Sequence, residues 1–271
     1  MRQPERLVLL GHPVAHSLSP TFQNAALQAS GIPVRYETLD VDGADFEQTV
    51  ERLRAENVWG NVTVPYKERM REACDSVTPL AERVGAVNTF WLDEDGRLIG
   101  DNTDVGGFAA AAETLLGETP RDLTIGVLGA GGAAAGVLAA VQSWQGCFAH
   151  VYNRTPERAR LLCERFSTVA ESVDDIGVIA GAQLIVNATS IGLRDESFPM
   201  DPAMIGANAA VLDLVYRRGE TAWVRAAREA GRRAADGTVM LVEQGAVAFQ
   251  RWFGIAPDRT AMWEAIGATG A

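Results

Sequence analysis

A lysine and an aspartate stand in two polar segments of this chain, and together they could move a proton. Lys67 closes the segment NVTVPYK, and Asp104 lies within GDNTDVGG. An ammonium group can donate a proton to an oxygen that gains negative charge, and a carboxylate can hold that ammonium in place. A glycine-rich turn further along the chain is typical of dinucleotide binding. Because reduction of a carbonyl needs a proton donor beside a hydride carrier, this combination favours a nicotinamide-dependent oxidoreductase.

The glycine-rich turn follows a short apolar run and precedes an alanine-rich helical pattern. Its sequence is GVLGAGGAAAG, and its central residues are Gly129, Ala130, Gly131, Gly132 and Ala133. Gly129 permits a tight turn, Gly131 lets the backbone approach a pyrophosphate, and the helix that follows offers unpaired N–H groups to the phosphates. By itself this Gly-x-Gly-x-x-Ala pattern is a weak signal, since many glycine-rich turns bind nothing.

The end of the next expected strand indicates which cofactor the turn would bind. An NAD site typically has an acid there, about 20 residues after the turn, that binds the ribose hydroxyls. This sequence has Asn153, Arg154 and Thr155 instead, with Arg158 one helical turn later. Guanidinium groups are suited to a 2′-phosphate, so the segment favours NADP. The same residues also fit a solvated helix start with Thr155 as N-cap, and both interpretations can hold together.

A third polar segment, GHPVAHSLSP, carries Ser17 and Ser19. If its backbone is extended, both hydroxyls point the same way and could bind a carboxylate just before a helix. We expect Ser19 to be the N-cap of that helix, with Pro20 at the first helical position. His12 and His16 are four residues apart, as metal ligands on a helix can be, but the proline between them argues against a helix, and we predict no metal site.

Short apolar runs alternate with helical patterns along the chain, which predicts an α/β fold with parallel sheets. The expected strands are 7–10, 34–39, 58–64, 87–92, 97–99, 123–128, 149–152, 184–187 and 211–214, and strands 87–92 and 97–99 form a hairpin. Gly106 and Gly107 precede an expected helix over 108–116. We therefore place the boundary between two lobes near residues 104–107 and expect a hinge there.

The composition argues against several classes of function. The chain has 271 residues, and 24 basic against 35 acidic residues give a net charge of −11, which argues against nucleic acid as a partner. Its three cysteines are scattered without a CxxC pair, which fits a reduced cytoplasmic setting, and no signal peptide is expected. Residues 123–141 are uncharged, but their five glycines favour a strand that turns into a helix over a membrane span.

Eight segments in a fixed order resemble those of the shikimate dehydrogenase family. They are GHPVAHSLSP, NVTVPYKE, GAVNTF, GDNTDVGGF, GAGGAA, NRTPERA, NATSIGL and LVEQGA, and they extend from about residue 8 to about residue 254. The resemblance implies a reversible, NADPH-dependent reduction of 3-dehydroshikimate to shikimate in aromatic amino acid biosynthesis. It also implies an N-terminal α/β substrate-binding lobe, residues 1–104 plus 240–271, a Rossmann-like NADP-binding lobe, residues 105–239, and a cleft between them.

The resemblance further implies roles for individual residues. Lys67 and Asp104 would be the catalytic pair. The substrate would be bound by Ser17 and Ser19 at its carboxylate and by Thr63, Lys67, Asn88, Asp104, Tyr216 and Gln244 at its hydroxyl and oxo groups. NADP would be bound by Gly129, Ala130, Gly131, Gly132, Ala133, Asn153, Arg154, Thr155, Arg158 and Thr189, with Leu214 and Gly237 near the nicotinamide. The expected partners are small molecules, not nucleic acid or membrane, and the expected state is a monomer or a homodimer.

Some positions depart from the family's pattern. Gln23 stands in place of a common histidine, Arg217 and Arg218 in place of Asn-Pro, and Val239 in place of a frequent glycine. A dehydrogenase for quinate or aminoshikimate would share the fold and the motifs. An NADP-binding sensor without activity would be expected to lack the lysine or the aspartate of the catalytic pair, and both are present.

Overall fold

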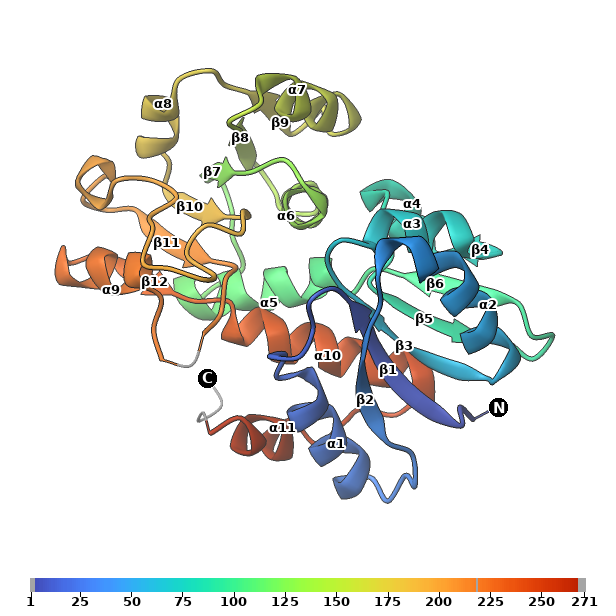
Figure 1. The fold of residues 1–271 in the computed structure, drawn as a ribbon. Coiled ribbons are helices and arrows are strands. Elements are labelled where there is room, and N and C mark those ends of the chain that lie inside the picture. Colours follow the sequence, from blue (N-terminus) through green and yellow to red (C-terminus); the bar gives the residue numbers. More distant parts are fainter. Residues whose placement is uncertain (1–2, 218, 268–271) are drawn as a thin grey trace. The chain divides into compact units, whose positions relative to one another are not determined.

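The computed structural model describes residues 3–217 and 219–267 of the chain (Figure 1). The chain divides into two compact units. One comprises Met1–Asp104 together with Leu241–Ala271, and the other comprises Val105–Met240. Which unit binds which molecule stays a prediction at this point. Arg218, one of the departures named above, lies outside the described residues.

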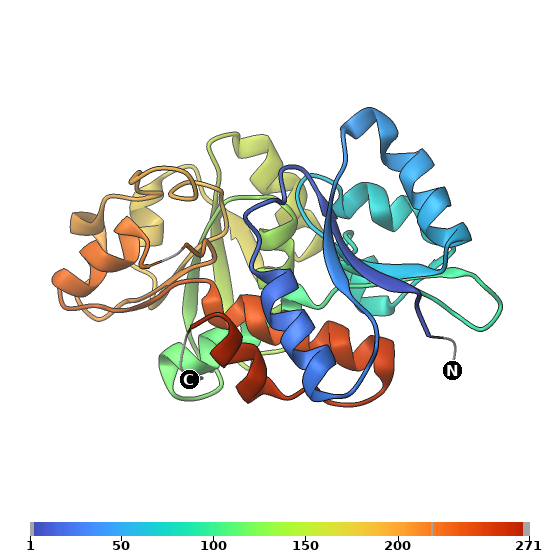
Figure 2. The same cartoon turned by 60° about the horizontal axis from the view of Figure 1, so that its bottom comes forward.

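The first unit contains a six-stranded sheet with helices around it. Its elements are β1 Arg6–Gly11, α1 Ser19–Ala29, β2 Tyr36–Asp40, the 3-10 helix η1 Gly43–Asp45, α2 Phe46–Ala55, β3 Val58–Val62, α3 Lys67–Ala73, β4 Ser76–Val77, α4 Pro79–Val84, β5 Thr89–Leu92, β6 Leu98–Asp101, most of α10 Thr238–Phe253, and α11 Arg259–Ala265. Two views show α11 beside α1 (Figures 1 and 2).

The strand order of this sheet is β2-β1-β3-β5-β6-β4. Strand β1 is parallel to β2 and β3, whereas β5 is antiparallel to β3 and β6. Strand β4 is parallel to β6, so two of the five pairings in this sheet are antiparallel. The expectation of a parallel sheet is wrong for these two pairings, whereas the expected hairpin of β5 and β6 is confirmed. The parallel strands β1, β2 and β3 end at one edge of the sheet, and the segments that follow them meet there.

The second unit is a doubly wound parallel sheet. Its elements are the rest of α5 Asp104–Leu116, β7 Thr124–Leu128, α6 Gly132–Val141, β8 Phe148–Tyr152, α7 Pro156–Arg165, β9 Ala170–Ser172, α8 Ile176–Ala180, β10 Leu184–Asn187, the 3-10 helix η2 Pro202–Met204, β11 Ala210–Asp213, α9 Ala222–Glu229 and β12 Arg233–Ala235. The order β12-β11-β10-β7-β8-β9 is that of a Rossmann sheet, with its switch point between β7 and β10. Every strand pairing in it is parallel.

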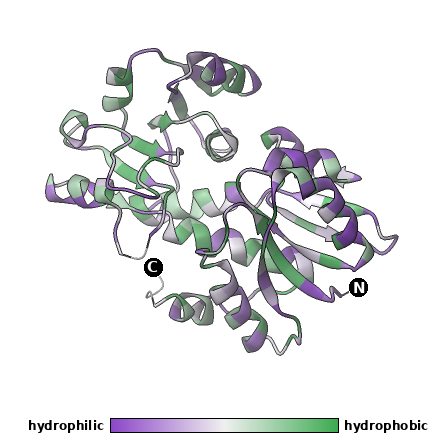
Figure 3. Cartoon of the chain, in the orientation of Figure 1, coloured by the Kyte–Doolittle hydropathy of each residue, from purple (hydrophilic) through white to green (hydrophobic). Residues whose placement is uncertain are grey.

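Hydropathy explains why these segments form these elements. Strands β10 and β11 are buried along their whole length and read as continuous apolar runs, as expected where helices cover both faces of a parallel sheet. Figure 3 shows them in green, whereas α7 is largely purple. In α2 the buried residues Phe46, Val50 and Leu53 recur at helical spacing, as the sequence predicted.

Three strands were not predicted, and two helix starts were predicted wrongly. Strands β4, β9 and β12 have only two or three residues each, too few for a periodic pattern. Helix α5 begins at Asp104 instead of Phe108, so Gly106 and Gly107 lie inside the helix, and the hinge expected there stays a prediction. Helix α1 has Leu18 as its N-cap, so Ser19 is its first residue instead of its cap. Among the described residues no helix is long and apolar enough to span a membrane.

Candidate active site

Lys67 and Asp104 are each the first residue of a helix, α3 and α5 respectively. The Lys67 Nζ atom donates to Asp104 Oδ2 at 2.7 Å, although the two residues are 37 positions apart in the chain. Their side chains are 20% and 7% exposed, so the pair is largely shielded from water. A helix N-terminus disfavours a cation, and the carboxylate opposite supplies the missing negative charge. The structure thus brings together the two residues on which the predicted chemistry depends.

The second carboxylate oxygen of Asp104 is held by Asn88. Asn88 Nδ2 donates to Asp104 Oδ1 at 2.7 Å, and Asn88 Oδ1 accepts from the backbone N–H of Thr103 at 2.7 Å. These two bonds fix which way the amide of Asn88 points. Asn102 Oδ1 also accepts from the backbone N–H of Asp104 at 3.1 Å, which caps the start of α5. The aspartate is therefore rigidly oriented, with one oxygen left for the lysine.

Gln244 joins this group from the C-terminal helix α10. Its Oε1 atom lies 3.4 Å from Asn88 Nδ2 and 3.4 Å from the hydroxyl oxygen of Thr103. Its Nε2 atom donates to the backbone carbonyl of Leu241 at 2.7 Å, which sets the orientation of the amide. Predicted site residues from three distant parts of the sequence thus meet in the first unit.

The segments after β1 and β3 carry the other predicted substrate residues of this unit. Leu18 has helical backbone angles, so the stretch from Ser17 to Ser19 is not extended. Ser17 Oγ instead accepts from the backbone N–H of Ser19 at 3.2 Å. Thr63 follows β3 and donates its backbone N–H to the carbonyl of Leu10 at 2.9 Å. A Cβ atom on Gly11 would lie 2.4 Å from the methyl group of Thr63, so only glycine allows this close packing.

Asp40 anchors the segment that carries the two serines. Its Oδ1 atom lies 2.6 Å from His12 Nδ1, and its Oδ2 atom accepts from the backbone N–H of Val14 at 3.3 Å. The hydrogen bond with His12, followed by that from Val14, lowers the pKa of Asp40 below its usual value. His12 therefore serves this loop as a partner of a carboxylate.

The predicted cofactor residues all lie at the carboxyl ends of strands in the second unit. Gly129 follows β7 with φ +115°, and a Cβ atom there would lie 2.9 Å from the carbonyl oxygen of Ala188. Ala130 and Gly131 complete the turn, and a Cβ atom on Gly131 would meet nothing within 4 Å. Helix α6 then begins at Gly132, followed by Ala133. The turn has the tight bend and the open backbone that a pyrophosphate requires.

The segment after β8 carries two exposed arginines. Arg154 and Arg158 are exposed, and neither side chain has a hydrogen-bond or ion-pair partner among residues 3–217 and 219–267. Arg160, on the same helix, is by contrast paired with Glu157 at 2.5 Å. Thr155 occupies the N-cap position of α7 as predicted, yet its side chain makes no capping bond. Its hydroxyl is therefore available beside the two guanidinium groups.

Comparison with known proteins places this geometry in a family. Residues 9–90 match the shikimate dehydrogenase substrate binding domain, and residues 237–266 match the shikimate 5′-dehydrogenase C-terminal domain. A shikimate dehydrogenase (NADP(+)) of Rubrobacter xylanophilus is 41% identical over 97% of this chain and 95% of its own. The chain belongs to the shikimate dehydrogenase family.

Solved structures of this family have the same fold. Shikimate dehydrogenase from Aquifex aeolicus has a TM-score of 0.90 at 34% identity, and the match covers 97% of both chains. Shikimate 5-dehydrogenase from Thermus thermophilus, solved in complex with NADP(H) and shikimate, has a TM-score of 0.87 at 40% identity. That match covers 97% of this chain and 98% of the other. The predicted α/β class, with a Rossmann-like domain, is confirmed.

A buried polar network joins Asn187 and Thr189, both in the segment NATSIGL, to Asp213 and Thr221, which the motifs did not include. Asn187 ends β10 and Asp213 ends β11, and Asn187 Nδ2 donates to Asp213 Oδ1 at 2.8 Å. Thr221 donates to Asp213 Oδ2 at 2.8 Å, while Thr189 donates its hydroxyl to Asn187 Oδ1 at 2.7 Å. Burial raises the pKa of Asp213, although these hydrogen bonds oppose the shift. A polar residue closing an apolar strand was the signal that could have found them.

The remaining predicted residues lie on the loops after β11 and β12. A Cβ atom on Gly237 would lie 2.3 Å from the carbonyl oxygen of Leu214, so glycine is required where these loops touch. Tyr216 follows on the β11 loop and is partly buried. Arg217 pairs with Glu196 at 2.9 Å, which ties this loop to the one after β10.

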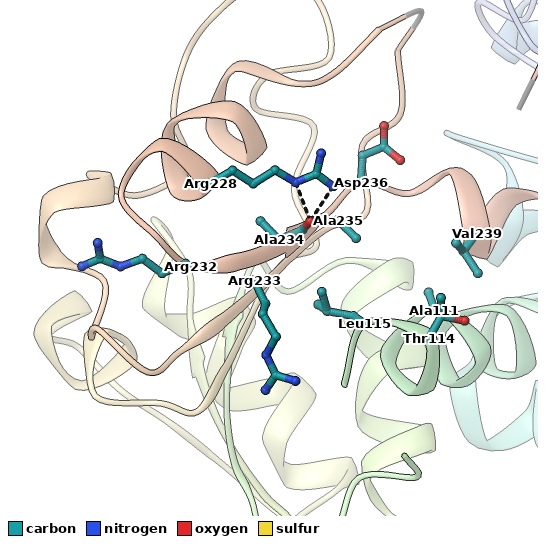
Figure 4. A pocket seen from close by; sticks show the side chains of 10 residues that line it. All are labelled: Ala111, Thr114, Leu115, Arg228, Arg232, Arg233, Ala234, Ala235, Asp236 and Val239. Atoms are coloured by element: carbon teal, nitrogen blue, oxygen red, sulfur yellow. Dashed lines mark hydrogen bonds between the residues drawn. The ribbon is translucent and has the colours of Figure 1, made fainter. Parts of the chain in front are cut away.

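The second unit also contains a hollow of about 370 Å³ between α5 and β12. Arg228, Arg232, Arg233 and Val239 are among the residues that line it, and none of the predicted site residues is among them. Figure 4 shows that the three arginines point in different directions, and Arg228 donates two hydrogen bonds to the carbonyl of Ala234. The guanidinium groups that line the hollow are therefore not directed at a common point.

One further signal for Lys67 lies in the composition. It is the single lysine of the chain, since the other 23 of the 24 basic residues are arginine. A guanidinium group stays protonated above pH 12 and is a poor proton donor near neutral pH. Arginine could not take over a proton-donating role. The presence of lysine at position 67 alone therefore fits such a role there.

Proposed function

We propose that this protein catalyses the reversible, NADPH-dependent reduction of 3-dehydroshikimate to shikimate in the biosynthesis of aromatic amino acids. The observation that carries the proposal is the shielded contact of 2.7 Å between Lys67 and Asp104, with Asn88 on the second carboxylate oxygen. It is supported by relatives that are NADP-dependent shikimate dehydrogenases, one of them solved with NADP(H) and shikimate.

The substrate carboxylate is bound by the hydroxyls of Ser17 and Ser19 at the start of α1. Ser19 is buried and begins a helix of 11 residues, whose first N–H groups and dipole favour an anion. Thr63, Asn88 and Gln244 bind the hydroxyl and oxo groups of the ring, since their polar atoms complement those groups. Tyr216 takes part in the same role.

NADPH supplies the hydride when it is bound to the second unit. The open backbone at Gly131 and the start of α6 fit a pyrophosphate, because nothing there would fill the space beside the turn. Arg154 and Arg158 hold the 2′-phosphate, with Asn153 and Thr155 beside it. Thr189, Leu214 and Gly237 lie on the neighbouring strand ends, where they bind the nicotinamide half.

Lys67 provides the proton. As the ketone carbon accepts hydride, its oxygen gains negative charge, and the ammonium of Lys67 stabilises that charge and then transfers a proton to it. One hydride and one proton convert the ketone to the alcohol. Asp104 keeps the lysine oriented and binds an adjacent substrate hydroxyl. Because each charge of the pair offsets the desolvation of the other, a charged lysine is tolerated in a shielded site.

A spectrophotometric assay of NADPH or NADH formation tests the assignment. Purified protein is given shikimate or quinate, each with NADP or NAD, and kcat/KM is compared for the four combinations. We expect the highest value for shikimate with NADP. A higher value for quinate with NAD would place the protein among quinate dehydrogenases, and the absence of turnover with all four would refute the proposal.

We also propose that the enzyme works in the cytoplasm as a monomer or a homodimer, with small molecules as its partners. The net charge of −11 disfavours nucleic acid, and the three cysteines lack the pairing of a disulfide framework. Light scattering during gel filtration distinguishes the two oligomeric states, and a larger assembly would contradict the proposal.

A further inference from the structure

A second buried carboxylate lies three residues before Asp104. Asp101 is the last residue of β6, and its side chain is 1% exposed. Arg251 Nε donates to Asp101 Oδ2 at 2.8 Å, and the backbone N–H of Asn102 donates to Oδ1 at 2.8 Å. The hydroxyl of Thr78 donates to Oδ1 as well. A buried charge is costly unless it is fully paired, so these three donors hold Asp101 in one orientation.

Asp101 is bonded to both residues that orient Asp104. Its backbone carbonyl accepts from the backbone N–H of Asn88 at 3.0 Å, and Asn88 in turn holds Asp104 Oδ1. Its side chain fixes the N–H of Asn102, whose own side chain caps Asp104 and donates to the carbonyl of Ala86 at 2.9 Å. A shift of the Asp101 backbone would therefore disturb both supports of this carboxylate, and its side chain bonds directly to one of them.

Arg251 extends this chain of contacts to helix α10. It lies seven residues after Gln244, which is two helical turns, so both side chains lie on the same face. Gln244 approaches Thr103 at 3.4 Å, and Arg251 binds Asp101. Helix α10 thus holds the segment from Asp101 to Asp104 at two points about 10 Å apart along its axis.

We propose that Asp101 and Arg251 are positioning residues for proton transfer by Lys67. The ion pair fixes the turn between β6 and α5, and the fixed turn orients the carboxylate of Asp104 toward the ammonium of Lys67. Neither Asp101 nor Arg251 contacts the substrate in this role. The inference rests on the proposed function for its kinetic consequences. Its geometric consequence, a fixed environment for the lysine, is independent of any activity.

The test compares Arg251→Gln with Arg251→Lys and with a matched control, Arg259→Gln. Arg251 is half exposed, so its substitution opens no cavity in the core, but it leaves the buried carboxylate of Asp101 without its cation. Arg259, on α11, forms an ion pair of 3.0 Å with Glu243 on α10. Within the described part of the chain, neither residue of that pair bonds to the turn that carries Asp101. We expect Arg251→Gln to lower kcat by about 10- to 100-fold, the range that a displaced catalytic group produces, with an unchanged KM for NADP. Arg251→Lys should restore most of kcat, because an ammonium can also donate to Asp101.

A second measurement separates this inference from the proposed function. Protein labelled with ¹³C at the lysine Cε gives one lysine signal, because the chain has a single lysine. We expect Arg251→Gln to move that signal and the pH profile of kcat, and Arg259→Gln to move neither. If the wild type turns over no shikimate, the proposed function fails while the ¹³C signal still tests the positioning. An unmoved signal in Arg251→Gln, with kcat like that of Arg259→Gln, would overturn the inference.

Discussion

Replacing Lys67 tests the proposed chemistry most directly, because a single substitution removes the proposed proton donor and leaves the second unit unchanged. A positioned general acid contributes about 10² to 10⁴ in rate. At about 1.36 kcal/mol for each factor of ten, this equals about 2.7 to 5.4 kcal/mol of transition-state stabilisation. We therefore expect Lys67→Ala to lower kcat at least about a hundredfold, with much smaller changes in both Michaelis constants.

The same substitution also affects stability, and the structure bounds that effect. Lys67→Ala leaves the buried carboxylate of Asp104 with Asn88 as its remaining side-chain donor among the described residues. The cost lies between that of an exposed and of a buried ion pair, about 1 to 3 kcal/mol. Kinetics are therefore measured at 25 °C, well below the unfolding transition, which is followed separately by circular dichroism.

Lys67→Arg serves as the matched control. It keeps a positive charge opposite Asp104, so stability should stay close to wild type, but a guanidinium does not release its proton near neutral pH. We expect kcat to remain low in this variant while the unfolding temperature recovers. A turnover within about threefold of wild type in either folded variant, far less than a general acid contributes, would remove Lys67 from the chemistry.

Three further outcomes follow from the second unit. Arg154→Ala should raise the KM for NADP about tenfold or more without changing NAD use, because it removes a charge-assisted phosphate contact. Arg160→Ala breaks only the pair with Glu157 and should leave the KM for NADP unchanged. An unchanged NADP/NAD preference in Arg154→Ala would contradict the 2′-phosphate assignment. Gly131→Ala should fold normally, since its Cβ meets nothing within 4 Å, but should bind NADP more weakly in a fluorescence titration. Gly129→Ala should instead lower the unfolding temperature, since its Cβ would lie 2.9 Å from a carbonyl oxygen and its φ is +115°. Burial raises the pKa of Asp213, so the folded state holds its proton more tightly than the unfolded state does. The contribution of Asp213 to the free energy of unfolding should therefore fall as pH rises from the usual carboxyl pKa through the raised one. In urea titrations over that pH window, the wild type should lose stability relative to Asp213→Asn, and a constant difference between the two would be evidence against the shift.

Local patterns predicted most of the elements and the segments of the site. Short apolar runs indicated β7, β8, β10 and β11 within one or two residues, because the strands of a parallel sheet covered by helices are rich in apolar residues. The short strands β4, β9 and β12 had no such pattern. The start of α5 was misjudged, because Gly106 and Gly107 have low helix propensity and only the capping bond from Asn102 and the aspartate at the first position compensate for it.

The sequence by itself determined which chemical groups this protein has and in which loops they lie. A single lysine, a carboxylate, paired serines, a glycine turn and two arginines near the position where an NAD site has an acid are all readable from residue types and short spacings. Local spacing carries this information because turns and caps depend on residues only a few positions apart.

Tertiary structure alone decided how those groups support one another. The contact between Lys67 and Asp104 spans 37 residues, and the bond from Arg251 to Asp101 spans 150. Contacts of that range are set by sheet order and by the return of α10, and no short pattern encodes them. The orientation of a buried carboxylate depends on these distant donors, because desolvation penalises every arrangement that leaves it unpaired.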